Sequence, residues 1–257
     1  MIVLSNVASG IFADGSTVDE AKKNEYLKEV VEVGEALSAK ANDQTIMYWA
    51  MERLCTAYKD LGEVAKAVKT ANKRPAVWLN KEVALTHILE GEELKAHLQE
   101  FLLQLIMQFT NMMSQLHRCD YDNEQTIKIN RKAIQIIKLF FENGDYGMQH
   151  LYLRDWYSRI AAAYAKMNDT DTVIENLSAA AEHAIAGDLL EENVPHTSLL
   201  FNTQKIQGYG KTYMTNESQN LLKVMAAEHF DFCRDDERFA EIKNKLIAVA
   251  CEDINTR

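Results

Sequence analysis

The sequence has few residues that interrupt helices. Only two of its 257 residues are proline and ten are glycine. Both residues mark turns and chain breaks, so their scarcity leaves little room for a fold with many tight turns. The composition is 47% hydrophobic, and long runs of Ala, Leu, Glu, Lys and Gln favour helix nearly everywhere. The sequence therefore predicts an all-α protein that is long enough to bury a sizeable core.

Positive charge is also scarce. The chain has 28 Lys and Arg against 38 Asp and Glu, a net charge of -10, and its pI is near 5.2. A surface this acidic repels a phosphate backbone, whereas nucleic-acid binders concentrate Lys and Arg. This excludes DNA binding by the chain alone.

Long apolar runs are missing as well. No segment reaches the roughly 18 to 20 apolar residues that cross a bilayer. The nearest one, 101–116, has no charge but carries several amides, so we expect a buried helix with one wet face. The opening "MIVLSNVASGIF" lacks the basic start and cleavage site of a signal peptide, and it is typical of the tail of a helix. We expect a cytoplasmic protein without a membrane partner, and a fragment or domain of something longer.

Paired cysteines and catalytic motifs are absent too. The four cysteines lie far apart with no C-x-x-C pair, which is typical of reduced thiols in a cytosolic protein. His117, Cys119 and Asp120 are close in sequence, but a structural zinc needs four ligands. His229 and Cys233 lie one helical turn apart and also lack a second pair. No motif of a zinc protease, nucleophile elbow or phosphate loop occurs, so we expect no enzyme, no metal and no cofactor.

What the sequence does contain is a diverged internal repeat. Aligned on Tyr58 and Tyr164, both copies show a large residue, a small residue, the tyrosine and then a turn residue. That turn residue is Gly62 in one copy and Asn168 in the other, and both tolerate the left-handed conformation. The tyrosines are 106 residues apart, close to three periods of about 34 residues. This is the tetratricopeptide pattern, in which small residues let antiparallel helices approach closely.

Capping residues and glycines predict the limits of further helices. Residues 188–215 form the least periodic stretch, and we expect an irregular loop there. The predicted helices cover residues 17–40, 80–90 and 92–116, a long segment opened by Asp122 or Asn123 and closed by Gly144, and a segment that restarts at 216–218.

The stretch "FDFCRDDERF" (230–239) raises the question of an acidic site near the end of the chain. Asp235 and Asp236 stand just before an apolar series with helical spacing, where carboxylates accept free backbone N–H bonds and favour the helix dipole. We therefore predict a helix cap. Phe230 and Phe239 should pack onto the last repeat, because an open repeat array exposes apolar surface.

Several stretches also occur in an order and spacing typical of a known family. They are "RPAVWLNKEVALTHILEGEE" (74–93), "LFFENGDYGMQHLYLRDWYSRIAAAYAKMND" (139–169), "AAEHAI" (180–185), "HTSLLFN" (196–202), "KTYMTNESQNLL" (211–222) and "FDFCRDDERF" (230–239). With them, the chain resembles the tetratricopeptide-like region that follows an N-terminal helix-turn-helix of the Cro/repressor type in many transcriptional regulators of Firmicutes.

The resemblance implies a regulatory module in which the helical repeats sense a ligand or partner. In better understood relatives of that architecture, the concave face holds a short signalling peptide. The basic opening that a helix-turn-helix would need is not present in this sequence. DNA would therefore be bound only through a domain absent from this chain.

The first helix of each repeat lines the concave face of such a solenoid. Arginine there would offer a planar fork for a carboxylate such as a peptide C-terminus. Each of these residues could equally be an ordinary solvated helix position, since charged residues are mostly exposed. The positions off the packing face are Trp49, Glu52, Arg53 and Thr56 in one repeat, and Asp155, Ser158 and Arg159 in the other.

A stripe of amides on the 92–116 helix is a second candidate. Gln104, Gln108, Asn111 and Gln115 fall on one face at helical spacing. Amides donate and accept, and can pair with the backbone of an extended peptide. The alternative is the wet face of a buried helix. The opposite face carries Leu102, Leu105, Ile106, Phe109 and Leu116.

Together these observations predict one right-handed α-α solenoid over residues 1–257. Helical hairpins would occupy 1–187, and an irregular loop and capping helices 188–257. The predicted function is a regulatory sensor that binds a peptide or protein on its concave face, as part of a transcriptional regulator. The alternative is a passive scaffold or dimerisation module, with a homodimer as a possible state.

Overall fold

The structure, a computed structural model, describes residues 20–73, 81–207 and 216–255. Within these ranges every regular element is helical, apart from one β-bridge between Pro195 and Lys205. This confirms the predicted all-α class. None of the described helices is long and apolar enough to cross a membrane. A continuous right-handed solenoid stays a prediction.

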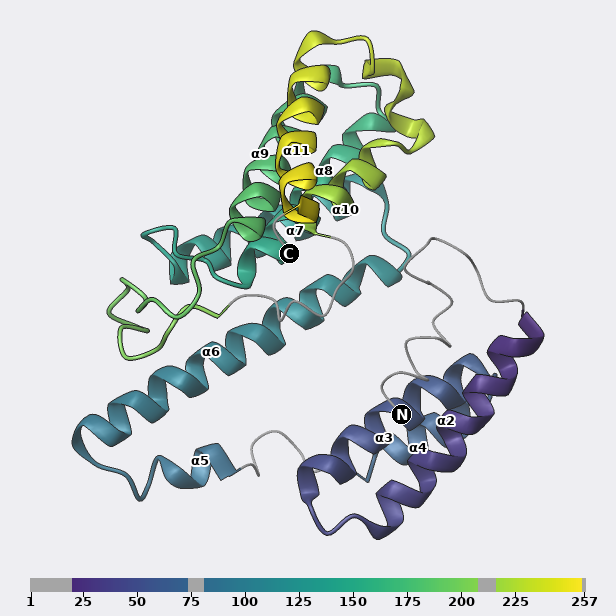
Figure 1. The fold of residues 1–257 in the computed structure, drawn as a ribbon, viewed down its shortest axis with the longest axis vertical. Helices are drawn as coiled ribbons and strands as arrows, with labels where there is room; N and C mark the ends of the chain where they lie inside the picture. Colours follow the sequence, from purple (N-terminus) through teal and green to yellow (C-terminus); the bar gives the residue numbers. More distant parts are fainter. Residues whose placement is uncertain (1–19, 74–80, 208–215, 256–257) are drawn as a thin grey trace. The chain divides into compact units, whose positions relative to one another are not determined.

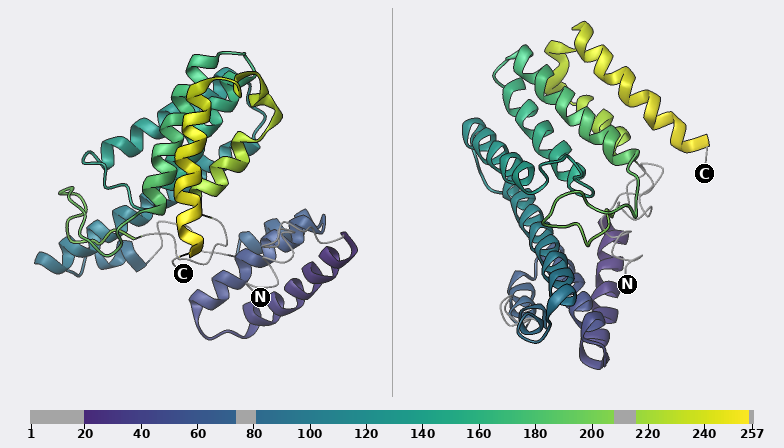
Figure 2. Two further views of the ribbon diagram at one scale, coloured as in Figure 1. Left: turned by 45° about the horizontal axis from the view of Figure 1, so that its top comes forward. Right: turned by 90° about the vertical axis from the view of Figure 1, so that its left-hand side faces the viewer.

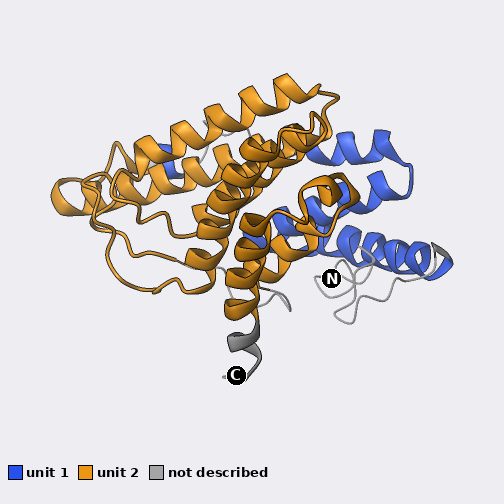
Figure 3. Ribbon diagram, turned by 90° about the horizontal axis from the view of Figure 1, so that it is seen from above, with its two compact units in different colours: residues 1–84 blue, residues 85–257 orange. Residues whose placement is uncertain are grey.

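The chain divides into two compact units, residues 1–84 and 85–257 (Figure 3). The first unit contains α2 (Glu20–Lys40), α3 (Gln44–Asp60) and α4 (Val64–Ala71). α3 packs against both of its neighbours. Its start is fixed by Asp43, whose carboxylate accepts the backbone N–H of Thr45 at 2.7 Å, as expected of a helix cap. The predicted cap of α2 at residues 17–19 lies outside the described residues.

The tyrosine repeat forms a tight crossing in the first unit. Leu54 and Tyr58 are buried on α3. A Cβ added at Gly34 of α2 would lie 2.8 Å from Cγ of Leu54. Only glycine fits at this contact, so α2 and α3 can approach closely. The Tyr58 hydroxyl donates to the Glu35 carboxylate of α2, and burial is the main reason that its pKa rises to about 12.

The second unit contains α6 (Gly91–Gln115), the longest of the described helices (Figure 1). α8 packs against α7 and α9, and α9 also packs against α10 and α11, as Figure 2 shows from two further directions. The short α5 (Lys81–Leu85) spans the boundary between the units. The other elements are η2 (Leu116–Arg118), α7 (Asn123–Phe140), α8 (Gln149–Ala165), α9 (Thr170–Asp188), α10 (Glu217–Met225), η3 (Glu228–Cys233) and α11 (Glu237–Asn255).

The predicted helix starts agree with the structure, while two predicted ends were wrong. Asp122 and Asn216 open α7 and α10, each with a reciprocal capping box. α7 was predicted to continue to Gly144, but it ends at Phe140, and a turn precedes Gly144. The helix predicted over 80–90 is only the five-residue α5. Gly144 follows the turn after α7, whereas Gly91 is the first residue of α6, so neither glycine ends a helix.

Two apolar cores hold the second unit together. One joins α8, α9, α10 and α11, and includes Leu177, Leu221 and Leu246 with no exposed surface. The other joins α6, α7 and α8 around Trp156. It also includes Phe201, which comes from the segment between α9 and α10. This non-helical segment is therefore part of the folded core.

The acidic stretch near the end of the chain is a structural cap. Asp236 accepts the backbone N–H of Arg238 at 2.9 Å, at the start of α11. Phe230 and Phe239 are both buried in the core that α9 and α8 form with α10 and α11. The predicted cap and the predicted packing of the two phenylalanines are confirmed.

Candidate functional site

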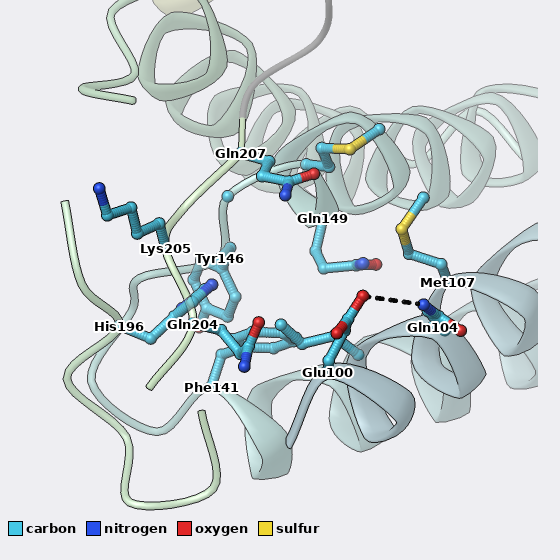
Figure 4. A pocket seen from close by; sticks show the side chains of 13 residues that line it. Glu100, Gln104, Met107, Phe141, Tyr146, Gln149, His196, Gln204, Lys205 and Gln207 are labelled. Carbon is cyan, nitrogen blue, oxygen red and sulfur yellow. Dashed lines mark hydrogen bonds between the residues drawn. The ribbon is translucent and has the colours of Figure 1, made fainter. Parts of the chain in front are cut away.

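A cavity of about 190 Å³ lies within the second unit (Figure 4). Three parts of the chain line it: α6, the turn from α7 into α8, and the segment before residue 208. Apolar and polar side chains are mixed on its walls, as in sites that hold small ligands. The lining residues are Glu100, Leu103, Gln104, Met107, Phe141, Tyr146, Gly147, Met148, Gln149, His196, Gln204, Lys205 and Gln207.

The wall made by residues 193–207 is held in shape by its own backbone. Ile206 donates its N–H to the carbonyl of Val194 at 2.8 Å, and His196 donates to Gln204 at 3.0 Å. Phe201 anchors the segment, because its ring is fully buried and stacks on Phe141 with centroids 5.1 Å apart. Residues 193–207, although not helical, are thus fixed by hydrogen bonds of their own and by packing on the core.

Gln99 of α6 fastens that wall from one side. This buried amide donates to the carbonyl of Leu199 at 3.0 Å. Its oxygen accepts the N–H of Thr203 at 2.8 Å. The side chain of Gln204 adds a bond to the carbonyl of Ala96 at 3.0 Å. Buried amides with every group paired give a unique placement, so α6 and the wall hold a fixed spacing.

Asp145 fastens the wall from the other side, where α7 turns into α8. One carboxylate oxygen accepts the N–H of Thr197 at 2.6 Å and lies 3.2 Å from Nδ1 of His196. Gly147 allows the wall to come close: its φ is +54°, and an added Cβ would lie 3.4 Å from the carbonyl oxygen of Gln207. A side chain at Gly147 would be both strained and crowded.

The polar lining of the cavity is concentrated on the α6 side. Gln104 donates to the Glu100 carboxylate at 3.4 Å, and Met107 lies one turn further along. Gln149, at the first position of α8, points its amide toward these three side chains (Figure 4). Lys205 extends away from the Glu100 and Gln104 pair in the same view.

Gln149 is the least satisfied polar group of the cavity. Its side chain is only 3% exposed, and within the described residues no donor reaches its Oε1. A buried acceptor without a partner costs about 1–3 kcal/mol, so buried amides are normally paired. An acceptor of this kind beside a cavity indicates a place where a bound molecule donates a hydrogen bond.

Tyr146 connects the cavity to a pair of histidines, of which His150 is buried and His183 half-buried. Its ring meets His150 and His183 edge-on, with centroids 5.3 and 5.5 Å away. The two Nδ1 atoms lie 3.0 Å apart, so one ring donates and the other accepts. Burial lowers the pKa of His150 to about 4 and is the main reason that the pKa of His183 falls to about 3. Both rings are therefore neutral in the folded protein.

A buried ion pair lies at the junction of α8, α9 and α10, where, within the described part of the chain, only Nε of Arg154 lacks a partner among its guanidinium nitrogens. Arg154 of α8 pairs with Asp155 at 2.6 Å and with the carboxylate of Glu217. Asp188 accepts the backbone N–H groups of Glu217 and Ser218 at 2.7 and 2.8 Å, which caps α10. Burial raises the pKa of Glu217, and Arg154 opposes that rise. These charges bind one another and serve to dock α10.

The sequence-predicted residues of the first unit lie along α3. Trp49 is 59% exposed and Thr56 is exposed, with its hydroxyl 3.4 Å from the carbonyl of Glu52. Arg53 is half-buried. These residues face away from the buried side of α3, as expected of the spacing, and none of them lines the cavity of the second unit.

In the second unit, the predicted amide stripe is used unevenly. Gln104 lines the cavity, and Gln108 is exposed outside it. Asn111 accepts the Tyr152 hydroxyl of α8, and Gln115 accepts a bond from Arg118 at 3.2 Å. Two of the five residues of the opposite face are open as well, since Leu102 and Leu105 are exposed.

The three predicted polar residues of α8 serve internal contacts. Ser158 was predicted to lie off the packing face, but it is buried, and its hydroxyl donates to the carbonyl of Arg154 at 2.8 Å. Asp155 pairs with Arg154. Arg159 donates to the carbonyl of Ser114 at 3.1 Å, near the end of α6. These contacts lie within the second unit. Because Arg159 binds the carbonyl of Ser114 near the end of α6, it does not form the predicted site for a carboxylate.

Most of the cavity was missed by reasoning from the sequence. Glu100, Tyr146, Gln149 and His196 come from three separated segments, and no repeat pattern brings them together. The one available signal was the aperiodic stretch 188–215, because ordered loops on a helical scaffold often carry function. No protein family, curated protein or solved structure matches this chain in comparisons with known proteins.

Proposed function

We propose that this chain is the sensor module of a regulator and binds a peptide, with the cavity of the second unit as the anchoring site. The observation that carries the proposal is Gln149, a buried amide whose unpaired acceptor faces a cavity with an ordered wall. The cavity, at about 190 Å³, is large enough for one side chain of a peptide, since a dry cavity of about 150 Å³ holds benzene. The remainder of a peptide would lie outside the cavity.

The amides around the cavity suit a peptide ligand. Gln104, Gln149 and Gln207 offer both donors and acceptors. Such groups pair with backbone amides whatever the side chains are, while the apolar wall of Leu103 and Met107 accommodates an aliphatic group. By the resemblance described above, the DNA-binding part of the regulator would be a separate domain, and the protein would be cytoplasmic.

A passive scaffold or dimerisation module is the second candidate. It is favoured by the exposed leucines of α6, since soluble proteins tend to cover contiguous apolar surface. Leu98, Leu102 and Leu105 are each about two-fifths exposed, at 40%, 38% and 37%, and they follow one another at helical spacing. An amphipathic face of this kind could pair with another copy of the chain.

The first test is native mass spectrometry of the full-length gene product, purified from the organism that encodes it. The proposal predicts a small mass that stays bound under native conditions and is released, as a peptide, by denaturation. A protein that is always empty and dimeric would contradict the sensor function and favour the scaffold.

Matched substitutions locate the site of that bound mass. Gln149→Met keeps the shape of the side chain but removes the unpaired acceptor, and it should abolish retention. Gln108→Met, on α6 but outside the cavity, is the control and should retain the ligand. Loss of the ligand in Gln108→Met but not in Gln149→Met would mean that the amide stripe predicted from the sequence, and not the cavity, is the binding surface.

A further inference from the structure

The cavity has acceptors that lack donors, and this imbalance defines the chemistry of its ligand. Oε1 of Gln149 has no partner among the described residues. The Glu100 carboxylate beside it accepts a long bond of 3.4 Å from Gln104. Both acceptors lie on the same side of the cavity (Figure 4). A molecule that fills this side must donate hydrogen bonds.

Three side chains of the lining that carry donors are directed elsewhere, while the amides of Gln104, Gln149 and Gln207 carry donors as well as acceptors. Lys205 extends away from Glu100 (Figure 4). The Gln204 amide donates to the carbonyl of Ala96 at 3.0 Å. Nδ1 of His196 faces the carboxylate of Asp145 at 3.2 Å. Glu100 is exposed, and within the described residues no cationic side chain pairs with it, so its negative charge is available to a ligand.

The rest of the lining fits an aliphatic stem that ends in a positive charge. Leu103 and Met107 continue the α6 wall beyond Gln104, and the stems of Lys and Arg pack on such apolar surface. Tyr146 adds an aromatic ring, which attracts cations. The net charge of -10 further favours a cation over an anion.

We infer that the cavity binds an alkylammonium or guanidinium group, as presented by a Lys or Arg side chain or the amino terminus of a peptide. The group would donate to both Glu100 and Gln149, and its stem would lie along Leu103 and Met107. This inference rests on the proposed function, and it reverses the expectation that an arginine of the protein holds a peptide carboxylate.

The test is an NMR titration of full-length protein that carries labelled methionine methyl groups. Met107 and Met148 line the cavity and report on it, while Met51 of the first unit is the internal reference. The probes are N-acetyl-lysine methylamide, its uncharged analogue N-acetyl-norleucine methylamide, which has the same four side-chain carbons without the ammonium group, and the free diamine cadaverine. Both probes should shift the two cavity methyls, and the shifts give a dissociation constant for each probe. We expect the dissociation constant of the lysine probe to be lower by about tenfold or more, which is the difference expected for a charge-assisted hydrogen bond.

Two substitutions complete the test. In Glu100→Gln, the dissociation constants of the lysine and norleucine probes should become nearly equal. Glu93→Gln, an exposed carboxylate on the same helix, is the control and should leave the preference for the lysine probe unchanged. Tighter binding of cadaverine than of the lysine probe would support the cationic site and identify a free amine as the source, which counts against the peptide function.

Two results would overturn the inference. One is equal binding of the charged and neutral probes, which would leave the cavity as a ligand site without charge selectivity. The other is an absence of shifts at Met107 and Met148 up to the solubility limit of the lysine probe. If native mass spectrometry still found a bound peptide in that case, the proposed function would stand and only the cationic chemistry would fail.

Discussion

The same tyrosine motif occurs in both units of this protein and is surrounded by different structures. In each copy the large residue before the tyrosine is buried: Leu54 is 2% exposed and Ile160 is 1% exposed. Both copies end in a left-handed residue, with φ of +80° at Gly62 and +57° at Asn168. The repeat therefore gives the same kind of helical hairpin in both units, α3 with α4 and α8 with α9.

The surroundings of the two tyrosines differ. Tyr58 is buried and donates to Glu35, whereas Tyr164 is half-buried and its hydroxyl receives a bond from Arg131 at 3.0 Å. In the second unit, residues 193–207 after α9 build a wall of the cavity. The comparison shows that a repeat can specify a helical hairpin without specifying the contacts or the cavity that surround it.

The largest contrast is expected between two tryptophans. Trp156→Ala should cost about 3–5 kcal/mol of unfolding free energy, because this ring has no exposed surface and lies at the centre of a core. Trp49→Ala should change stability by less than about 0.5 kcal/mol, since Trp49 is 59% exposed. Urea denaturation followed by circular dichroism measures both. Similar losses in the two variants would contradict the assignment of the cores.

Acidic pH should destabilise the second unit selectively. The pKa of His150 is lowered from 6.5 to about 4 in the folded protein, so the unfolded chain binds more protons between these values. Stability is then fully present above pH 6.5 and is lost as the pH falls toward 4, by about 3 kcal/mol for this group alone. His183 acts in the same direction.

Residues 1–84 contain no histidine, so the first unit should not share this loss. Hydrogen exchange at a series of pH values distinguishes the units peptide by peptide. In His150→Leu/His183→Leu, where both partners of the hydrogen bond are replaced, the decline should be smaller. A decline of the original size would show that other groups cause it.

The smallest effect is expected at the two left-handed turn positions. Gly62→Ala should destabilise by about 1–2 kcal/mol, because an L side chain is disfavoured at its φ of +80°. Asn168→Gly should be neutral or slightly stabilising, since glycine has no such penalty at the φ of +57°. Thermal denaturation of both variants compares the turns. A gain of stability in Gly62→Ala would mean that the two hairpins end differently.

Helices were predictable from the sequence to the extent that local chemistry defines them. Capping residues such as Asp122, Asn216 and Asp236 act on the next few N–H groups, and all three were recognised as helix starts. Helix ends were less accurate, because Gly144 ends a turn whose length depends on the burial of Phe141. Local patterns alone do not contain that packing.

The cavity could not have been predicted in the same way. Gln104 was identified from its amide stripe, but its neighbours Gln149 and His196 reach it through contacts such as Gln99 with Thr203, which join residues about a hundred positions apart. The sequence also suggested Arg159 for binding a carboxylate, and that arginine is occupied by the end of α6. Long-range hydrogen bonds decide which polar residues remain available to a ligand.

The central claim is that the cavity of the second unit is the ligand site of this protein. The most direct measurement is a crystal structure of the full-length chain purified from the organism that encodes it. We predict electron density for a bound molecule that donates hydrogen bonds to Gln149 and Glu100, between α6 and the 193–207 segment. Density only on the exposed face of α3 around Trp49, or a cavity that contains nothing but water, would contradict the account.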